Sequence, residues 1–438
     1  MTAILFKLLL VVASGLLGAG VLRTRLMDLQ EVTFRRAVII LQLVPVLGLF
    51  VALYVVGHQQ PTSDVPGYYM PAAHAVLAGE VPFRDFTLSY GPLFAYLGSA
   101  LVFAWDSGKV FALFAIALNA VALLWWHAAA SARFDRTTAR QCTVLYATSG
   151  HVLVQALRGT NQAWVSAALG ASALLLARDR SAASGLAQAV AAVSTKVLAH
   201  LFWPVLWICA PHRTRWAIAA ALPTAAVYAA FVAIGAGPGL LYPLRHEGEL
   251  ISPGNLPYLL DLALASAGPL EHIVFDIMTV SALALTIVWL YIRARKLPAQ
   301  DRQTLLLTGL ALTGLIFMLF SKKSFTGYVI FVMYPIVFVL VRGLTNLPAR
   351  VSFLLGFNAL LVVEPSLWFH LEGFHSSLHT WFAMVGGPTV TGFVLLDVAL
   401  IACYVYLAWL SIRGVLLTVD GAISSRNSSQ SATACSVV

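Results

Sequence analysis

A polar segment at residues 58–108 carries the residues best suited to chemistry in this chain. It contains Asp64, Arg84, Asp85 and Tyr90, and it lies between apolar runs long enough to enter a bilayer. Membrane proteins rarely keep a carboxylate beside the membrane without a function for it. Such a carboxylate can act as a general base, which takes the proton of an attacking hydroxyl. From position alone, Asp64 is equally well explained as a solvated acid or as a helix N-cap, because Asp-x-Pro can start a helix.

Four cations stand beside or inside apolar sequence, where they could bind a phosphate. Lys196 lies between the nearly apolar stretches VAAVST and VLAHLFW, and Arg158, Lys322 and Lys323 lie near the ends of other apolar runs. A lysine in such surroundings needs a partner, and a phosphate is a good one. Cations around a departing phosphate stabilise the negative charge that grows in the transition state. The ordinary alternative for each cation is a side chain that extends its charge to the membrane surface.

Other chemistries find weaker support in the sequence. His246 and Glu247, in YPLRHEGEL, could bind an acceptor sugar or a metal, but no metal-ligand spacing accompanies them and a solvated loop is the better interpretation. The four cysteines also lack metal-ligand spacing, and we expect no disulfide. Without a Walker A or dinucleotide fingerprint, a nucleotide sugar is a poor candidate for the donor. We therefore expect no cofactor, although the sequence leaves a divalent metal open.

The composition is that of a protein embedded in a membrane. Apolar residues make up 60% of the 438 residues and charged residues only 10%, whereas soluble domains carry roughly 25% charged residues. The formal net charge of +9 does not indicate nucleic acid as a partner, because the basic residues stand mostly in short turns between apolar runs. We expect a single integral domain over residues 1–412 and a disordered, Ser-rich cytoplasmic tail over residues 413–438.

The apolar runs predict an all-α polytopic bundle of about 11–13 membrane segments. They occupy residues 2–22, 37–57, 109–130, 141–157, 163–178, 185–195, 198–209, 216–236, 271–292, 303–321, 325–343, 351–364 and 388–412. Segment 91–105 is also apolar, but it is shorter than the about 20 residues that a spanning helix needs. We expect it to lie along the membrane surface or to re-enter the membrane.

Basic residues decide the orientation of this bundle. If segment 91–105 does not cross, most of the basic residues fall on one face, which the positive-inside rule makes cytoplasmic. The N-terminus and three sizeable loops, at residues 58–108, 237–270 and 365–387, then lie on the outer face. The expected location is a cell membrane, a bacterial inner membrane in particular, with any chemistry on its outer side.

The loop around Asp64 resembles the GT-C superfamily of membrane glycosyltransferases, which use polyprenyl-phosphate sugars. The closest resemblance is to the polyprenol-phosphate-mannose-dependent mannosyltransferases of glycosyltransferase family 87. Their first loop has a D…Y…G…PYRDF…Y-P-like pattern. In this chain the pattern stands as Asp64, Tyr68, Gly79, Pro82-Phe83-Arg84-Asp85-Phe86 and Tyr90-Gly91-Pro92.

Later segments extend the resemblance over most of residues 60–340. Residues 158–162, RGTNQ, correspond to a G-Q-N-like element of the family, with the Asn and Gln in altered order. Residues 321–328, SKKSFTGY, followed by Tyr334-Pro335, resemble the family's late outer loop. The stretch around Lys196 resembles a small-residue helix of the family, but it lacks the proline three residues after the lysine.

The resemblance implies a GT-C-like helical bundle and an inverting transfer of a hexose, mannose in particular. The donor would be a polyprenyl-phosphate sugar and the acceptor a lipid or glycan on the outer face. Asp64 would be the general base, and the donor phosphate would be bound by Lys196, Lys322, Lys323 and Arg158. Substrate would be bound by Tyr68, Arg84, Asp85, Tyr90, Gln162 and His246, with Asp85 orienting either Arg84 or the acceptor.

A non-catalytic membrane protein is the alternative. It would be a transporter or flippase of lipid-linked sugars, or a subunit of an assembly complex. A transporter is expected to place charged residues along a path through its spans and to show repeats with broken helices. In this sequence the polar residues gather on one face and charge within the spans is sparse, which favours chemistry at a membrane surface.

Overall fold

The computed structural model describes residues 2–61, 64–243, 251–264, 272–370 and 387–435. Over these residues the protein is helical, and its one β feature is an isolated bridge between Pro82 and Phe86. Nine helical segments in the described part are long and apolar enough to cross a membrane. These observations confirm the prediction of an all-α, multi-pass membrane protein.

The long helices follow the predicted apolar runs. They are α1 (Thr2–Val21), α2 (Glu31–Phe50), α5 (Lys109–Ser131), α11 (Arg213–Phe231), α14 (His272–Ala294), α15 (Leu306–Phe320), α16 (Met333–Gly343), α17 (Leu347–His370) and α19 (Gly387–Cys435). Tighter or wider helical turns extend α2 through Val51–Val56 and α11 through Val232–Ala236 and Gly237–Leu241. Similar turns at Asp301–Leu305 and Thr326–Val332 lead into α15 and α16.

Short helices complete the bundle and support the outer loop. Within the bundle these are α6 (Arg136–Ala147), α7 (Gly150–Leu157), α8 (Gln162–Ala177), α9 (Ser181–Ser194) and α10 (Trp203–Cys209), the last preceded by a 3-10 turn at Val197–Phe202. Outside it, a π-helical turn at Val65–Tyr69 leads into α3 (Met70–Leu77), and α4 (Phe94–Ala104) and α13 (Leu256–Leu264) follow. Segment 91–105 thus forms a helix of 11 residues, about 16 Å long, which is too short to span a bilayer.

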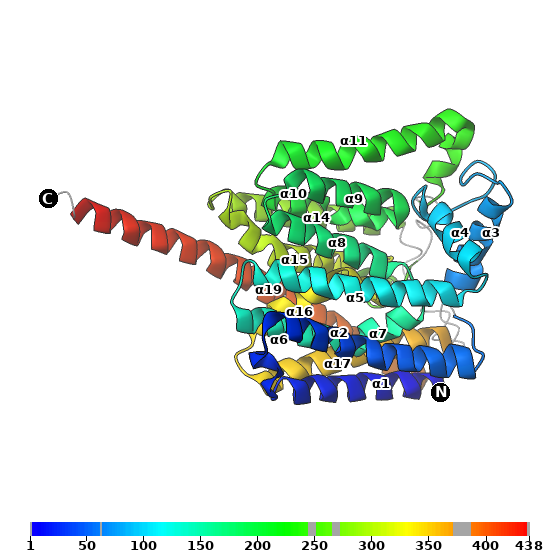
Figure 1. Ribbon diagram of the computed structural model, residues 1–438, viewed down its shortest axis with the longest axis horizontal. Helices are drawn as coiled ribbons and strands as arrows, with labels where there is room; N and C mark the ends of the chain where they lie inside the picture. Colours follow the sequence, from blue (N-terminus) through cyan, green and yellow to red (C-terminus); the bar gives the residue numbers. More distant parts are fainter. Residues whose placement is uncertain (1, 62–63, 244–250, 265–271, 371–386, 436–438) are drawn as a thin grey trace.

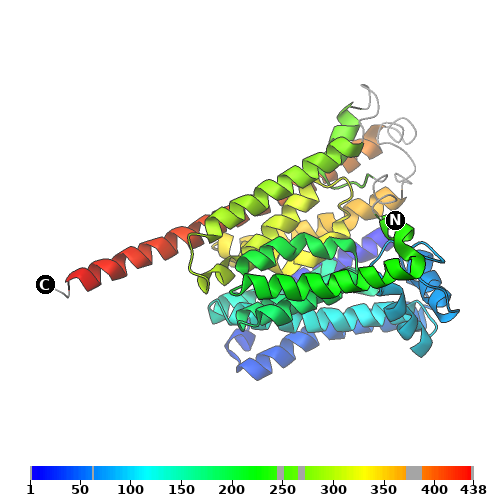
Figure 2. The same cartoon turned by 90° about the horizontal axis from the view of Figure 1, so that it is seen from above.

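The helices of the bundle run roughly side by side (Figures 1 and 2). The N-terminus, α3 and α4 lie at one end, and the last part of α19 extends from the other end (Figure 1). Segments Asp301–Phe320 and Thr326–Gly343 form the centre and are mostly buried, whereas Ile273–Ala294 is mostly exposed at the periphery. The peripheral helices expose apolar side chains such as Ile277 and Leu285, as expected of surfaces that contact lipid.

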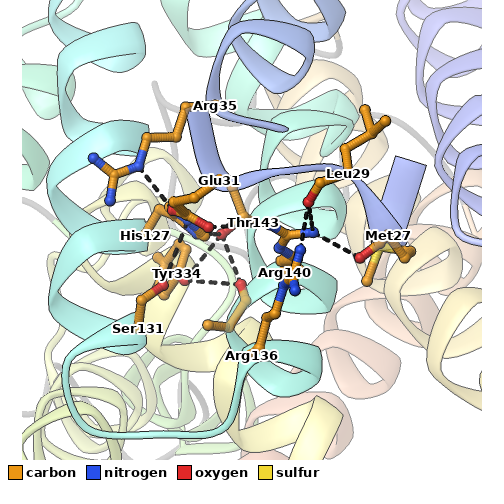
Figure 3. A network of polar contacts seen from close by, with 11 residues as sticks. Met27, Leu29, Glu31, Arg35, His127, Ser131, Arg136, Arg140, Thr143 and Tyr334 are labelled. Atoms are coloured by element: carbon orange, nitrogen blue, oxygen red, sulfur yellow. Dashed lines mark hydrogen bonds and ion pairs between the residues drawn. The ribbon is translucent and has the colours of Figure 1, made fainter. Parts of the chain in front are cut away.

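A polar network holds the bundle together at the end opposite α3 and α4 (Figure 3). His127 of α5 lies between Glu31, with 2.7 Å from Nε2 to the carboxylate, and Thr143 of α6, with 2.8 Å from Nδ1 to the hydroxyl. The Thr143 hydroxyl also lies 3.2 Å from the hydroxyl of Tyr334 in α16. One chain of hydrogen bonds therefore joins α2, α5, α6 and α16.

Arg140 extends this network to the turn between α1 and α2 (Figure 3). Its guanidinium is almost fully buried, donates to the carbonyl oxygens of Met27 and Leu29 at 2.7 Å each, and lies 3.1 Å from the Glu31 carboxylate. It also lies over the ring of Phe34, 4.4 Å from the centroid. These contacts explain why α2 begins at Glu31, before the predicted residue 37, since the first turn of the helix is fixed by polar partners rather than by hydropathy.

The end of the chain differs from its prediction. We expected a disordered tail over residues 413–438, but α19 continues as a helix to Cys435. Its sequence after Pro388 contains no further proline, and Gly414 and Gly421 weaken a helix without stopping it. Extending an existing helix avoids the unfavourable nucleation step. Ser-rich composition was therefore a poor guide to disorder next to a spanning helix.

Candidate active site

A cavity of about 190 Å³ opens among segments that are far apart in the sequence. Its walls come from the outer loop, from the turns before α8 and after α9, from the 3-10 turn before α16, and from the end of α17. Seven of the predicted site residues line it: Asp64, Tyr68, Tyr90, Arg158, Gln162, Lys196 and Lys323. The structure therefore brings the expected base and three of the four expected phosphate-binding cations into one cavity.

Asp64 and Tyr90 form the acidic side of the cavity. Asp64 directly precedes the π-helical turn Val65–Tyr69, and the Tyr90 hydroxyl donates a hydrogen bond to Asp64 Oδ2 at 3.1 Å. Burial, together with the nearby Tyr69 and Asp64, raises the pKa of the Tyr90 phenol well above its ordinary value. Tyr90 consequently keeps its proton and acts as the donor, which fixes one oxygen of the carboxylate.

Gly91 places Tyr90 beside the turn that carries Lys196. The Gly91 N–H donates to the Thr195 carbonyl oxygen at 2.5 Å, and the Leu93 N–H donates to the Val193 carbonyl oxygen at 2.7 Å. A Cβ on Gly91 would lie 2.5 Å from the Val193 carbonyl oxygen, so a side chain cannot be accommodated without moving the backbone. The Tyr-Gly-Pro pattern seen in the sequence therefore has a steric role, because glycine allows the loop to approach this turn.

Lys196 is held among aromatic rings. Its ammonium donates a hydrogen bond to the Tyr328 hydroxyl at 3.1 Å. It also lies 5.0 Å from the ring centroid of Tyr328 and 5.3 Å from that of Tyr90. Such contacts orient an ammonium over the faces of aromatic rings, and here they hold the Lys196 ammonium at the wall of the cavity.

Arg158 contributes a second positive charge to the cavity. It caps the C-terminal end of α7, and its guanidinium makes no hydrogen bond or ion pair with the residues that the structure describes. Burial lowers the pKa of this guanidinium, and the charge of nearby Asp64 opposes that shift. Since an arginine side chain remains protonated in proteins, Arg158 is a partly buried charge to which a bound anion would be a suitable partner.

The neighbouring polar residues are also suited to a ligand. Gln162 stands at the first position of α8, lines the cavity, and has a buried side-chain oxygen without a hydrogen-bond partner in the described part of the chain. Gln155 and Thr160 line the same region. The N-terminal end of α8 adds its partial positive charge. Sequence reasoning missed Gln155, Thr160 and Tyr328, and the only cue for Tyr328 was its place in the motif SKKSFTGY.

Arg84 and Asp85 lie outside the cavity. The guanidinium of Arg84 donates to both oxygens of Asp85 at 2.8 and 2.9 Å, and the Val81 N–H donates to Asp85 at 2.8 Å. The hydrogen bonds from Arg84 lower the pKa of the Asp85 carboxyl to about 2. Asp85 therefore orients Arg84, as one of our two expectations stated, but the structure does not place this pair against the cavity.

Two neighbouring lysines have different surroundings. Lys323 lines the cavity, whereas Lys322 is almost fully buried and its ammonium lies 2.8 Å from the Asp276 carboxylate of α14. The structure does not place Lys322 in the cavity, and its ion pair with Asp276 links the turn after α15 to α14. His246 lies outside the described residues, so its predicted role stays a prediction.

The arrangement can remove a proton and hold an anion in the same cavity. The Asp64 carboxylate and three cations, Arg158, Lys196 and Lys323, line this cavity. Such a set suits attack by a hydroxyl group with departure of a phosphate. Within the described ranges, no group of three or more His, Cys, Asp or Glu residues could hold a metal ion. Comparison of the chain with models of protein families and with curated proteins finds no match, so the resemblance to glycosyltransferase family 87 stays a prediction.

Proposed function

We propose that this protein transfers a hexose, mannose in particular, from a polyprenyl-phosphate donor to a lipid or glycan acceptor on the outer face of the membrane. The observation that carries the proposal is the cavity that joins Asp64 to Arg158, Lys196 and Lys323. These residues come from four separate parts of the sequence. Of these residues, the resemblance of the outer loop concerns Asp64 alone, so the presence of the three cations in the same cavity is additional support.

The reaction follows from the roles of these groups. Asp64 takes the proton of the acceptor hydroxyl while the hydroxyl oxygen forms a bond to the anomeric carbon of the hexose. The bond between that carbon and the phosphate oxygen breaks, and the polyprenyl phosphate leaves with the electron pair and one more negative charge. Arg158, Lys196 and Lys323 stabilise this growing charge. A single displacement inverts the configuration at the anomeric carbon.

The location of the cavity supports a lipid-linked donor. Lining residues Asp64, Tyr68 and Tyr90 belong to the segment that leads into α3 and α4, at one end of the bundle. Turns rich in arginine, such as residues 132–136 and 178–180, lie between helices at the other end (Figure 1). By the positive-inside rule, this distribution supports an outer location for the cavity, where a lipid-linked sugar would be the available donor.

A transfer assay tests the proposal directly. Purified protein is incubated with radiolabelled polyprenyl-phosphate mannose and a membrane lipid extract, and the label is followed into a product other than the donor. We expect transfer by the parent protein and loss of transfer in Asp64→Asn, with donor binding retained. A flippase would instead move the labelled donor across vesicles without changing it. Movement of the donor without transfer of any hexose would refute the proposal.

A further inference from the structure

A second cluster of acids lies inside the bundle, apart from the cavity. Glu364 of α17 and Asp397 of α19 both have no exposed side-chain surface, and both stand within segments apolar enough to span a membrane. Buried carboxylates are costly in such a position unless a positive charge or hydrogen bonds compensate them. The proposed transfer reaction makes no use of either residue.

The packing of α17 against α19 sets these two acids opposite each other. The rings of Phe357 in α17 and Tyr404 in α19 lie 5.8 Å apart between centroids. Glu364 follows Phe357 by seven residues and Asp397 precedes Tyr404 by seven, about two helical turns in each case. Because the two helices run in opposite directions (Figure 1), these steps bring both carboxylates to the same level and the same face.

Most of the oxygen atoms in this cluster have no hydrogen-bond partner among the described residues. Asp397 Oδ1 accepts a hydrogen bond from the Gly254 N–H at 2.5 Å. The two oxygens of Glu364, Asp397 Oδ2 and the Tyr404 hydroxyl are buried without a partner there. Tyr404 is itself fully buried, and a helical side chain leans toward the N-terminal end of its helix, which is the direction of Asp397.

The titratable groups around Glu364 and Asp397 are acidic or neutral. Tyr258 and Asp261 of α13 and Cys403 of α19 are the remaining titratable groups around Glu364, Asp397 and Tyr404 in the described part of the protein. None of these groups is a lysine, arginine or histidine. Two like charges in a low-dielectric interior cannot both persist without a counter-charge.

We propose that Glu364, Asp397 and Tyr404 form a buried site for one monovalent cation, taken up either as a proton or as a sodium ion. The shared chemistry is a single positive charge held by oxygen atoms, which are the ligands that hard cations prefer. Either ion neutralises one carboxylate charge, and a sodium ion engages several of the unpartnered oxygens at once. The proposal does not depend on the transfer reaction.

The site lies directly behind the wall of the cavity. Pro365, the residue after Glu364, lines the cavity. Gly254, which Asp397 holds, has a left-handed backbone with φ of +86°, and a Cβ on it would lie 3.6 Å from the side chain of Thr326, another lining residue. A bound cation therefore stabilises α17, α19 and the segment before α13 in the positions that shape the cavity.

Thermal unfolding of the protein in lipid nanodiscs tests this site without measuring activity. Sodium chloride is compared with N-methylglucamine chloride at equal ionic strength, at about pH 6 and about pH 9, where the proton supply differs greatly. With sodium at a hundredfold excess over its Kd, we expect the Tm at the higher pH to rise by about 3 °C. At the lower pH the difference should vanish, because protons then occupy the site.

Variants assign the effect to this cluster. Glu364→Gln removes one charge at nearly constant shape and should abolish the sodium dependence, and Tyr404→Phe should weaken it. Asp106→Asn, which removes an exposed carboxylate in the outer loop, should keep the parent's response.

The two ions give different results. If the proton alone binds, Tm falls as pH rises, sodium does not restore it, and the infrared carbonyl band of a protonated carboxyl disappears in Glu364→Gln. Either result supports the site and names its ion. A parent protein whose Tm responds to neither ion would overturn the proposal, as would a Glu364→Gln or Tyr404→Phe variant that responds fully like the parent.

Discussion

Replacing Tyr90 with phenylalanine tests whether Asp64 acts as a base held by its neighbour. The change deletes one hydroxyl and keeps the ring, which stacks on Phe94 at 4.4 Å between centroids and meets Tyr69 edge-on at 5.2 Å. It therefore removes the hydrogen bond of 3.1 Å to Asp64 Oδ2 and leaves the packing in place.

The structure sets the size of the expected effect. A hydrogen bond to a charged group contributes about 1.5–3 kcal/mol. The oxygen–oxygen distance of 3.1 Å lies just beyond the usual range of about 2.5–3.0 Å, so we take the lower value. Because about 1.4 kcal/mol corresponds to a factor of ten, Tyr90→Phe should lower kcat/KM roughly tenfold. Asp64→Asn removes the proton acceptor itself and should lower turnover by roughly 10² to 10⁴.

The assay measures kcat and KM for transfer from radiolabelled polyprenyl-phosphate mannose. We expect the loss in Tyr90→Phe to fall mainly on kcat, since the phenol holds the base and not the donor. Tyr96→Phe, the same change at a partly exposed ring of α4, is the matched control and should match the parent. Full activity in Tyr90→Phe would show that its hydroxyl does not position Asp64. A loss as large as that of Asp64→Asn would make Tyr90 itself a reacting group.

Three further predictions concern the donor, the loop and the orientation. Lys196→Met should reduce both donor affinity in a binding titration and kcat in the transfer assay, because its ammonium would meet the phosphate in ground and transition states; unchanged values would remove it from the site. Gly91→Ala should lower Tm and activity, because its Cβ would lie 2.5 Å from a backbone carbonyl oxygen, whereas Gly356→Ala, with nothing within 4 Å, should change neither. In a chain without its native cysteines, a cysteine at Glu80 should react with a membrane-impermeant thiol reagent in intact cells and one at Thr137 should not; the reverse pattern would invert the proposed orientation.

Hydropathy and charge predicted the fold well because they act on whole segments. Each spanning helix needs about 20 apolar residues whatever its neighbours are, so runs such as 109–130 and 303–321 mark helices directly. The same reasoning could not place α2's start at Glu31 or the helix beyond residue 412. Both depend on local contacts and on helix propagation, which a hydropathy pattern does not register.

The sequence predicted several residues of the candidate site from their type, but it did not predict which residues contact one another. Asp64 and Lys196 stood out because charge next to apolar sequence is costly, a signal that needs no partner to be recognised. Lys322 and Lys323 carry the same signal, yet one pairs with Asp276 and the other lines the cavity. Adjacent residues in a turn point in different directions, so their partners come from distant helices that the sequence does not identify.

Glu364 shows the reverse failure. It lies in the apolar run LLVVEPSLWF, which still qualifies as a span because one acid lowers its hydropathy only a little. We argued from the sequence that charge within the spans is sparse, which favoured surface chemistry over transport. The burial of both Glu364 and Asp397 weakens that argument, although it leaves the cavity at the outer end unchanged. Charge inside the spans is present, and two of the acids lie in one buried cluster.

The contrast between two polar regions distinguishes stabilising contacts from a binding site. In the network of Figure 3, Glu31 has His127, Arg35 and Arg140 as partners at 3.1 Å or less, so its charge is already compensated by the protein. In the cavity, the buried side-chain oxygen of Gln162 has no hydrogen-bond partner among the described residues, and the partly buried guanidinium of Arg158 makes no hydrogen bond or ion pair with them. A folded protein retains such groups at a cost when a ligand completes them. Polar groups without a hydrogen-bond partner, more than the presence of charge, distinguish the cavity from the network of Figure 3 and support it as the site of the proposed phosphate.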